Sequence, residues 1–211
     1  EWMLTARADM TSHFKRAGVD LTWQPMEVAP ANHTWLGGLR VDEHAESSTI
    51  KGLYAAGEAA GGWGGSNRLG GNALAAALGS GIIAGESAAA RARRVPLPPI
   101  DKGQVTAECA RLQGLLERRE GVKAAVLKGQ VQELVQEHVW LKRGEEGLRQ
   151  TLARLEKMEE SDVPELCVPR GRDSVRYLRL RESLEAANLV QCGRLVAAAA
   201  LARKESRGSH Q

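Results

Sequence analysis

The amino-acid sequence predicts an α+β protein in which a glycine-rich α/β part comes first and an all-α helical bundle follows. Thirteen of the 23 glycines lie between Gly37 and Gly85, among short apolar runs, a pattern typical of strands joined by tight turns. Beyond residue 101, apolar residues recur every three or four positions, which is the period of an amphipathic helix. The proline-rich stretch VPLPPID at 95–101 reads as the linker, because proline breaks helices and stiffens extended chain.

The composition excludes several classes of protein. The 211 residues are 43% hydrophobic and 26% charged, as in ordinary globular proteins. Basic and acidic residues, 29 and 26 in number, are well mixed, so no basic stripe indicates nucleic-acid binding. The three cysteines, Cys109, Cys167 and Cys192, form no CxxC pattern, which indicates a reducing, cytoplasmic setting without a cysteine-bound metal. Because no unbroken apolar run approaches about 18 residues, no membrane-spanning segment is expected.

Four elements are expected in the first hundred residues. The segment GVDLTWQPMEVAP at 18–30 is a candidate strand bounded by proline. Residues 37–58 suggest a hairpin-like pair, whose last part, GLYAAGE at 52–58, reads as a buried strand. Residues 72–94 predict a long helix, in which small residues would let another backbone or a ligand approach closely.

The second half predicts three or four antiparallel helices around one shared core. Leu148, Leu152, Leu155 and Met158 are spaced by four, three and three residues, which gives an amphipathic stripe. Residues 121–140 repeat this pattern. Residues 174–206 predict a long final helix that is stopped at Gly208.

The order strand, acid, glycine loop and helix indicates a nucleotide cofactor site. Glu58, at the predicted strand end, is placed to accept hydrogen bonds from sugar hydroxyls, and the helix after the loop offers unpaired N–H groups. Arg68 is a candidate bidentate clamp for a carboxylate, and His33 could bind a substrate carboxylate or donate a proton. The same residues also fit a tight turn with close packing, a surface arginine and a structural histidine.

Three segments in order, HTWLGGL at 33–39, IKGLYAAGEAAGG at 50–62 and SNRLGGNAL at 66–74, carry a resemblance to a known family. They resemble H-Y-x-M-G-G, G-L-(Y/F)-A-x-G-E and H-G-A-N-R-L-G-G-N-(S/A)-L of the fumarate reductase/succinate dehydrogenase flavoproteins, which include L-aspartate oxidase. KRGEEGL at 142–148 and the end of the chain at 187–210 are similar to segments of the helical domain of that family. The tail residues that match its signature are Arg203, Glu205, Ser206, Arg207 and His210, for which a structural role is expected.

The resemblance implies an FAD-dependent oxidoreductase that transfers hydride between flavin and a dicarboxylate-like substrate. His33 and Arg68 match the residues of the family that bind the substrate, and Glu58 would hold the ribose of FAD. The first turn of the helix after Gly71 would face the pyrimidine edge of the flavin. The residues implied in cofactor binding are Gly37, Gly38, Glu58, Asn67, Gly71, Asn72, Ala73 and Leu74.

Two departures from the family pattern bear on the substrate. The histidine of H-G-A-N-R is Gly64 here, and the tyrosine after the substrate histidine is Thr34. The bulky Trp35 and Trp63 lie in the same loops. The carboxylate pocket is therefore expected to differ from that of a fumarate or succinate enzyme.

The resemblance also implies a domain organisation. Residues 1–97 would be the C-terminal part of an FAD-binding α/β (Rossmann-like) domain, with 1–20 as the end of the capping region, and 98–211 would be the helical C-terminal domain. The family's GxGxxG unit and capping domain are not found in these 211 residues. The chain is thus expected to be one component of a split flavoprotein or the C-terminal piece of a longer one, inactive alone.

The implied partners are an N-terminal FAD and capping portion, in the same precursor or as a separate subunit, and a small dicarboxylate. An iron–sulfur or other electron-transfer subunit is a further candidate, through which the protein could lie on the cytoplasmic face of a membrane. Two other functions remain open at this point: a non-catalytic interaction module of a flavoprotein complex, and a fragment of an L-aspartate oxidase-like enzyme.

Overall fold

The computed structural model describes residues 8–27, 32–169 and 173–211. The chain divides into two compact units, Glu1–Trp35 and Leu36–Gln211. In the first unit, helix α2 (Ala8–Arg16) ends before Gly18, whose φ is +84°. Such a left-handed conformation favours glycine, so this residue suits the helix end.

The strand expected at 18–30 is wrong over the described residues 18–27, which form a turn at 21–23 and contain no strand. The cause is Asp20, whose carboxylate accepts hydrogen bonds from the Thr22 hydroxyl and, at 3.0 Å, from the Thr22 backbone N–H. These two bonds, the hydroxyl first, lower the pKa of Asp20 below its ordinary value. A side chain that binds nearby backbone N–H groups competes with strand pairing. The remaining residues of that prediction, 28–30, lie outside the described residues.

The hairpin-like pair expected at 37–58 forms as isolated bridges. Val41 pairs antiparallel with Ser47, and Glu46 pairs antiparallel with Tyr54. Asp42 Oδ1 accepts from the N–H groups of residues 44 and 46, at 2.9 and 3.0 Å, and thereby shortens the ladder. The N–H of Glu46 is the main reason that the pKa of Asp42 is lowered.

The buried strand expected at 52–58 is wrong beyond its single bridge at Tyr54. The chain instead enters the 3-10 helix η1 (Gly57–Ala59). Gly57 has φ +62°, and its N–H donates to Ser80 Oγ at 2.8 Å rather than to a neighbouring strand. This hydrogen bond ties Gly57 to the helix that contains Ser80, so the Gly57 N–H is not available for pairing with a strand.

Helix α3 (Asn72–Ala92) confirms the long helix expected after the glycine loop. Its buried Ser80 accepts from Gly57 and donates to Ala76 O at 2.5 Å. A Cβ on Gly57 would lie 3.4 Å from the Ala77 Cβ. Small side chains on α3 therefore allow η1 to pack closely, as expected from the sequence.

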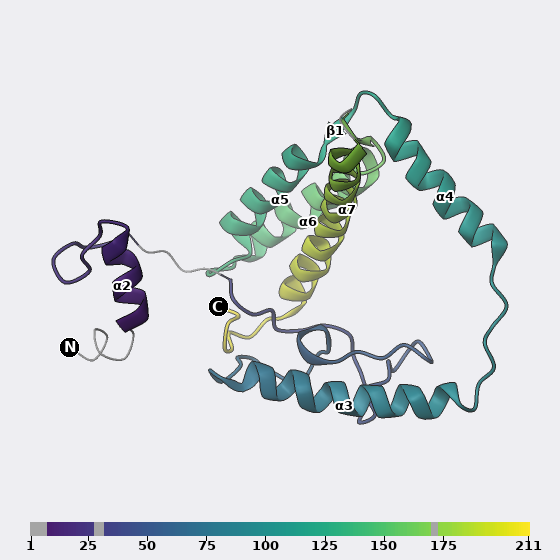
Figure 1. Cartoon of the computed structure of the whole chain (residues 1–211), viewed down its shortest axis with the longest axis horizontal. Helices are drawn as coiled ribbons and strands as arrows, with labels where there is room; N and C mark the ends of the chain where they lie inside the picture. Colours follow the sequence, from purple (N-terminus) through teal and green to yellow (C-terminus); the bar gives the residue numbers. More distant parts are fainter. Residues whose placement is uncertain (1–7, 28–31, 170–172) are drawn as a thin grey trace. The chain divides into compact units, whose positions relative to one another are not determined.

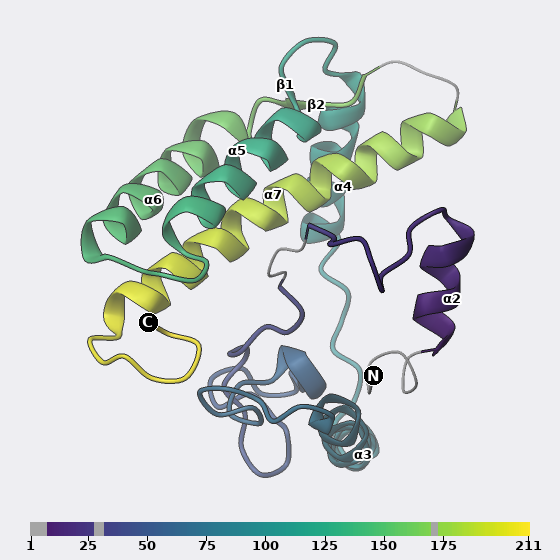
Figure 2. The ribbon, with the colours of Figure 1, turned by 90° about the vertical axis from the view of Figure 1, so that its left-hand side faces the viewer.

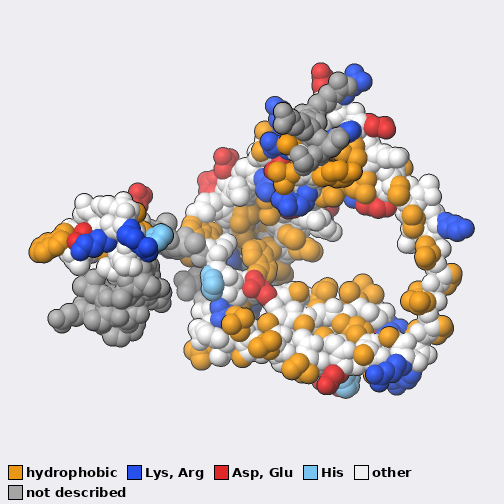
Figure 3. All heavy atoms as spheres, in the orientation of Figure 1, with side chains coloured by type: hydrophobic (Ala, Val, Ile, Leu, Met, Phe, Trp, Pro, Cys, Tyr) orange, Lys and Arg blue, Asp and Glu red, His pale blue; other side chains and the backbone are white. Residues whose placement is uncertain are grey.

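By length and composition, α3 is apolar enough to cross a membrane, and 11% of its most hydrophobic 18-residue window is buried. Figure 3 shows hydrophobic side chains gathered along this helix. The expectation that no such segment exists rested on unbroken apolar runs, and it overlooked α3 because glycine, serine and glutamate interrupt the apolar residues of this helix.

Residues 95–101 have no regular structure, as expected for a linker, and α4 (Lys102–Glu117) follows. Asp101 caps α4 by accepting hydrogen bonds from the N–H groups of Gly103 and Gln104, at 2.8 and 3.2 Å. An N-cap of this kind stabilises a helix by about 1 kcal/mol. The linker thus ends at Asp101, the N-cap residue of α4.

Helices α5 (Ala124–His138), α6 (Glu145–Lys157) and α7 (Asp173–Ala202) pack side by side (Figures 1 and 2). Strand β1 (Val122–Lys123) pairs in parallel with β2 (Leu166–Cys167), and a π-helical turn, η2 (Met158–Asp162), ends α6. The core is formed by Leu115, Ala124, Leu127, Val131, Leu155, Met158, Leu166, Val168, Ala186 and Val190. The expected helical core is therefore confirmed.

Two boundaries in the bundle differ from the expectation. The helix expected from residue 121 begins at Ala124, because 122–123 pair with β2. The final helix ends at Ala202 and does not reach Gly208. The residues that follow form a turned tail, in which the Arg203 guanidinium binds the Glu205 carboxylate.

Thr151 is buried in α6 with 0% of its surface exposed, and its hydroxyl has no hydrogen-bond partner among the described residues. Burying an unpaired hydroxyl costs roughly 1–3 kcal/mol. We expect Thr151→Val to raise the free energy of unfolding by about 1 kcal/mol in urea denaturation. Thr106→Val is the control, because the exposed Thr106 hydroxyl donates to Lys102 O at 2.9 Å. An equal gain in both variants would contradict the assignment.

Candidate functional site

The first part of the site is a glycine turn packed against η1. The Leu39 N–H donates to Ala59 O at 2.9 Å, and the Gly61 N–H donates back to Leu39 O at 2.8 Å. Gly38 has φ +129°, and a Cβ there would lie 2.7 Å from the Ala59 carbonyl carbon. Only glycine fits at this position. Gly38 is thus brought next to the turn that carries Glu58.

Glu58 lies in η1 with its side chain exposed. The hydrogen bond from Gly57 to Ser80 ties this turn to α3. The carboxylate and the N-terminal half of α3 therefore belong to one locally fixed piece. An exposed carboxylate held in this way can accept hydrogen bonds from a pair of hydroxyls.

The glycine loop leads into the N-terminus of α3 without a capping side chain. Gly71, the N-cap residue, has φ +87°. The first helical residues, Asn72, Ala73 and Leu74, are exposed. A helix of 21 residues presents a positive dipole end and unpaired N–H groups at its start. This end of α3 can face an electron-rich group.

Much of the loop surface is open backbone. A Cβ placed on any of the glycines at 37, 62, 65, 70 or 71 would meet no atom within 4 Å. The loop therefore leaves room for a flat ring to approach the backbone. Together with the exposed carboxylate and the uncapped helix, these residues fit a flavin nucleotide.

Arg68 is half-buried in the loop, next to the exposed Asn67. One guanidinium nitrogen, Nη1, donates to Leu69 O at 3.4 Å. The position that is histidine in the family motif is Gly64, where a Cβ would lie 2.8 Å from Leu36 Cδ2 and 3.7 Å from the Arg68 Cβ. The apolar side chain of Leu36 therefore lies next to the position where the family motif has histidine.

His33 is exposed and lies in the first compact unit, whereas the glycine loop belongs to the second. The two predicted substrate residues, His33 and Arg68, thus belong to different compact units. Among the described residues, no group of three or more His, Cys, Asp or Glu side chains is placed to hold a metal ion.

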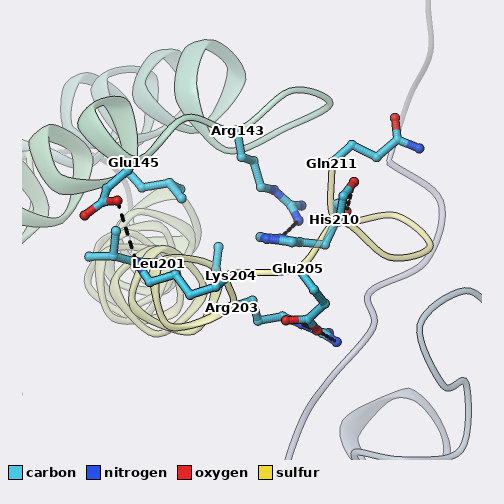
Figure 4. Close-up of a pocket in the computed structure, with 11 residues that line it drawn as sticks. Arg143, Glu145, Leu201, Arg203, Lys204, Glu205, His210 and Gln211 are labelled. Carbon is cyan, nitrogen blue, oxygen red and sulfur yellow. Dashed lines mark hydrogen bonds and ion pairs between the residues drawn. The ribbon is translucent and has the colours of Figure 1, made fainter.

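The sequence did not predict a second group of side chains, from the start of α6 and the tail of the chain, that lines a hollow of about 230 Å³ at the end of the bundle. Arg143 and the tail residue His210 meet there at 2.9 Å (Figure 4). Burial lowers the pKa of the Arg143 guanidinium. The matches at 142–148 and in the tail were the available signal, but neither motif indicates that the two segments touch.

Comparison with known proteins identifies the class of protein. The model for the FAD binding domain matches residues 3–74, and the model for the fumarate reductase flavoprotein C-terminus matches residues 128–211. Both descriptions belong to FAD-dependent flavoproteins.

Individual similar proteins indicate which flavoproteins within this class the chain resembles. A fumarate reductase (CoM/CoB) subunit from Methanothermobacter marburgensis is 36% identical over 95% of this chain and 36% of its own length. The fumarate reductase flavoprotein subunit of Escherichia coli is 31% identical over 92% and 32%, respectively. Mycobacterium smegmatis Sdh1 in complex with UQ1 has a TM-score of 0.88 at 32% identity, over 99% of this chain and 35% of that one.

The chain belongs to the fumarate reductase/succinate dehydrogenase flavoprotein family. The resemblance, the fold class and FAD as the cofactor are thereby confirmed. The chain spans about a third of the length of the curated relatives that it matches.

Proposed function

We propose that this chain supplies one share of the flavin site and of the substrate site of an FAD-dependent oxidoreductase that acts on a dicarboxylate-like substrate. The observation that carries the proposal is the bond between η1 and α3, because it holds Glu58 beside the helix that starts from the glycine loop. A packing role would need small residues there, but it would not need an exposed acid.

Within this proposal, Glu58 binds the ribose of FAD, and the N–H groups at Asn72, Ala73 and Leu74 face the flavin, where negative charge develops on reduction. The open backbone of the glycine loop contacts the cofactor. FAD supplies the hydride chemistry when it is bound. His33 and Arg68 bind the substrate carboxylates and orient the substrate.

The domain organisation proposed from the sequence is supported by the linker. The matches to the two family models, at 3–74 and 128–211, lie on either side of it. We therefore assign 1–97 to the FAD-binding part, with 1–20 as the end of the capping region, and 98–211 to the helical domain.

The proposed partners are the N-terminal FAD and capping portion, in the same precursor or as a separate subunit, and an electron-transfer subunit. They are supported by the relatives, which are fumarate reductase subunits, and by the solved structure of Mycobacterium smegmatis Sdh1 in complex with UQ1. Such an assembly would place this chain on the cytoplasmic side, next to a membrane through its partners.

The replacement Glu58→Ala tests the cofactor role in the assembled flavoprotein. We expect FAD affinity to fall on the order of tenfold or more, because a hydrogen bond to a charged group is among the stronger ones. The measurement is flavin content by absorbance, together with titration of the apoprotein. Glu43→Ala removes an exposed carboxylate from the same unit and should leave flavin content unchanged. Equal flavin content in all three proteins would contradict the role.

A further inference from the structure

The last residues of the chain form a tight hairpin. The Arg207 N–H donates to His210 O at 2.8 Å, and the His210 N–H donates back to Arg207 O at 3.0 Å. Gly208 begins the two-residue turn between them with φ +58°. A positive φ at this position of a hairpin turn favours glycine. The sequence G-S therefore builds a turn of defined shape.

The turn of this hairpin lies directly on the glycine loop. The Ser209 N–H donates to Ser66 O at 3.1 Å. A Cβ added to Gly208 would collide with the Ser66 carbonyl oxygen and would lie 2.6 Å from its carbon. The tail and the loop thus meet backbone to backbone, over a separation of more than 140 residues.

Arg143, in the loop between α5 and α6, holds the other side of the hairpin (Figure 4). Its backbone N–H donates to Gln211 O at 2.9 Å, and its Nη1 lies 2.9 Å from His210 Nδ1. The same guanidinium donates to the carbonyl oxygens of Val139 and Trp140. Because an arginine only donates, His210 Nδ1 is the acceptor, and the ring proton lies on Nε2.

We propose that this hairpin is a brace that positions the glycine loop, and that Gly208 and Arg143 are positioning residues for Arg68. Ser66, which the brace contacts, is two residues before Arg68. The loop itself is rich in glycine with open space around it, and such backbone is costly to order. The contacts of the tail fix it from outside. The proposal rests on the role of Arg68 proposed above.

The brace has a consequence that tail packing alone would not have. If the hairpin only sealed the end of the bundle, its loss would loosen the tail and leave the loop unchanged. If it positions the loop, its loss moves the guanidinium of Arg68, and displacement by about 1 Å can cost on the order of 100-fold in kcat/KM. Loop order and substrate binding therefore distinguish the two roles.

The test is Gly208→Ala in the assembled flavoprotein. We expect hydrogen exchange of the amides at 62–71 to accelerate on the order of tenfold. We also expect KM for fumarate or succinate to rise more than kcat falls, while flavin content stays constant. Gly18→Ala is the matched control, because Gly18 also has positive φ but a Cβ there meets nothing within 4 Å. Unchanged exchange at 62–71 would overturn the brace, and faster exchange with unchanged KM would overturn its role in positioning.

Arg143→Lys is the second variant, in case Gly208→Ala fails to fold. A lysine keeps the charge and the backbone bond to Gln211, but it cannot serve the three side-chain acceptors at once. We expect the same changes in hydrogen exchange and KM, but smaller. If Arg143→Lys changes neither of them, the proposal is overturned. If the wild-type assembly turns over no dicarboxylate, the proposed function fails, and hydrogen exchange alone then decides whether the brace exists.

Discussion

Arg68→Lys should reduce kcat/KM for dicarboxylates by about 100-fold, which is about 2.7 kcal/mol of transition-state stabilisation. The guanidinium is a planar fork that donates two parallel hydrogen bonds to one carboxylate, whereas an ammonium group is a point charge. Flavin content should stay unchanged, because no contact with FAD is proposed for the side chain of Arg68. The measurement is steady-state turnover of fumarate and succinate by the assembled flavoprotein.

The control for this replacement is Arg40→Lys. Arg40 is exposed in the same compact unit, and its backbone oxygen accepts from Ser48 N at 3.2 Å. That bond involves no side-chain atom, so kcat/KM should remain at the wild-type value. If turnover on every dicarboxylate tested survives Arg68→Lys, the clamp role is wrong. If Arg40→Lys causes the same loss of kcat/KM, the effect is not specific to the guanidinium of Arg68.

The glycine loop and α3 could be predicted because their signals are local. The loop ends at Gly71 and the helix begins with the next residue, in an order that is visible along the chain. The strands before the loop could not be predicted in the same way. Asp42 and Ser47 accept backbone N–H groups two to four residues further on, and this competition depends on conformations that propensity does not reveal.

Long-range contacts explain the other differences. The stripe Leu148, Leu155 and Met158 is buried as its spacing predicts, but Leu152 is only partly so. The parallel pairing of β1 with β2 joins segments more than 40 residues apart, and no periodicity encodes it. The contact between Ser66 and Ser209 is of the same kind. The motifs therefore predicted what the candidate site contains, and the three-dimensional structure was needed to find what holds it.

Leu155→Ala should lower the free energy of unfolding by roughly 3–4 kcal/mol, because it leaves a cavity in the bundle core. Leu155 is 0% exposed in α6 and belongs to the main core. Urea denaturation followed by circular dichroism measures the change. Leu195→Ala in α7, where the side chain is 65% exposed, should change the value by no more than about 0.5 kcal/mol. Similar losses in both variants would contradict the assigned core.

A second substitution tests where that cavity lies. A Cβ on Gly193 of α7 would lie 3.1 Å from Leu155 Cδ1, so Gly193→Ala alone should crowd the core and destabilise it by roughly 1 kcal/mol. In the Leu155→Ala background the same methyl group enters the vacated space, and alanine also favours the helix over glycine. We therefore expect the double variant to be more stable than Leu155→Ala alone. Strict additivity of the two losses would mean that α6 and α7 do not meet at this point.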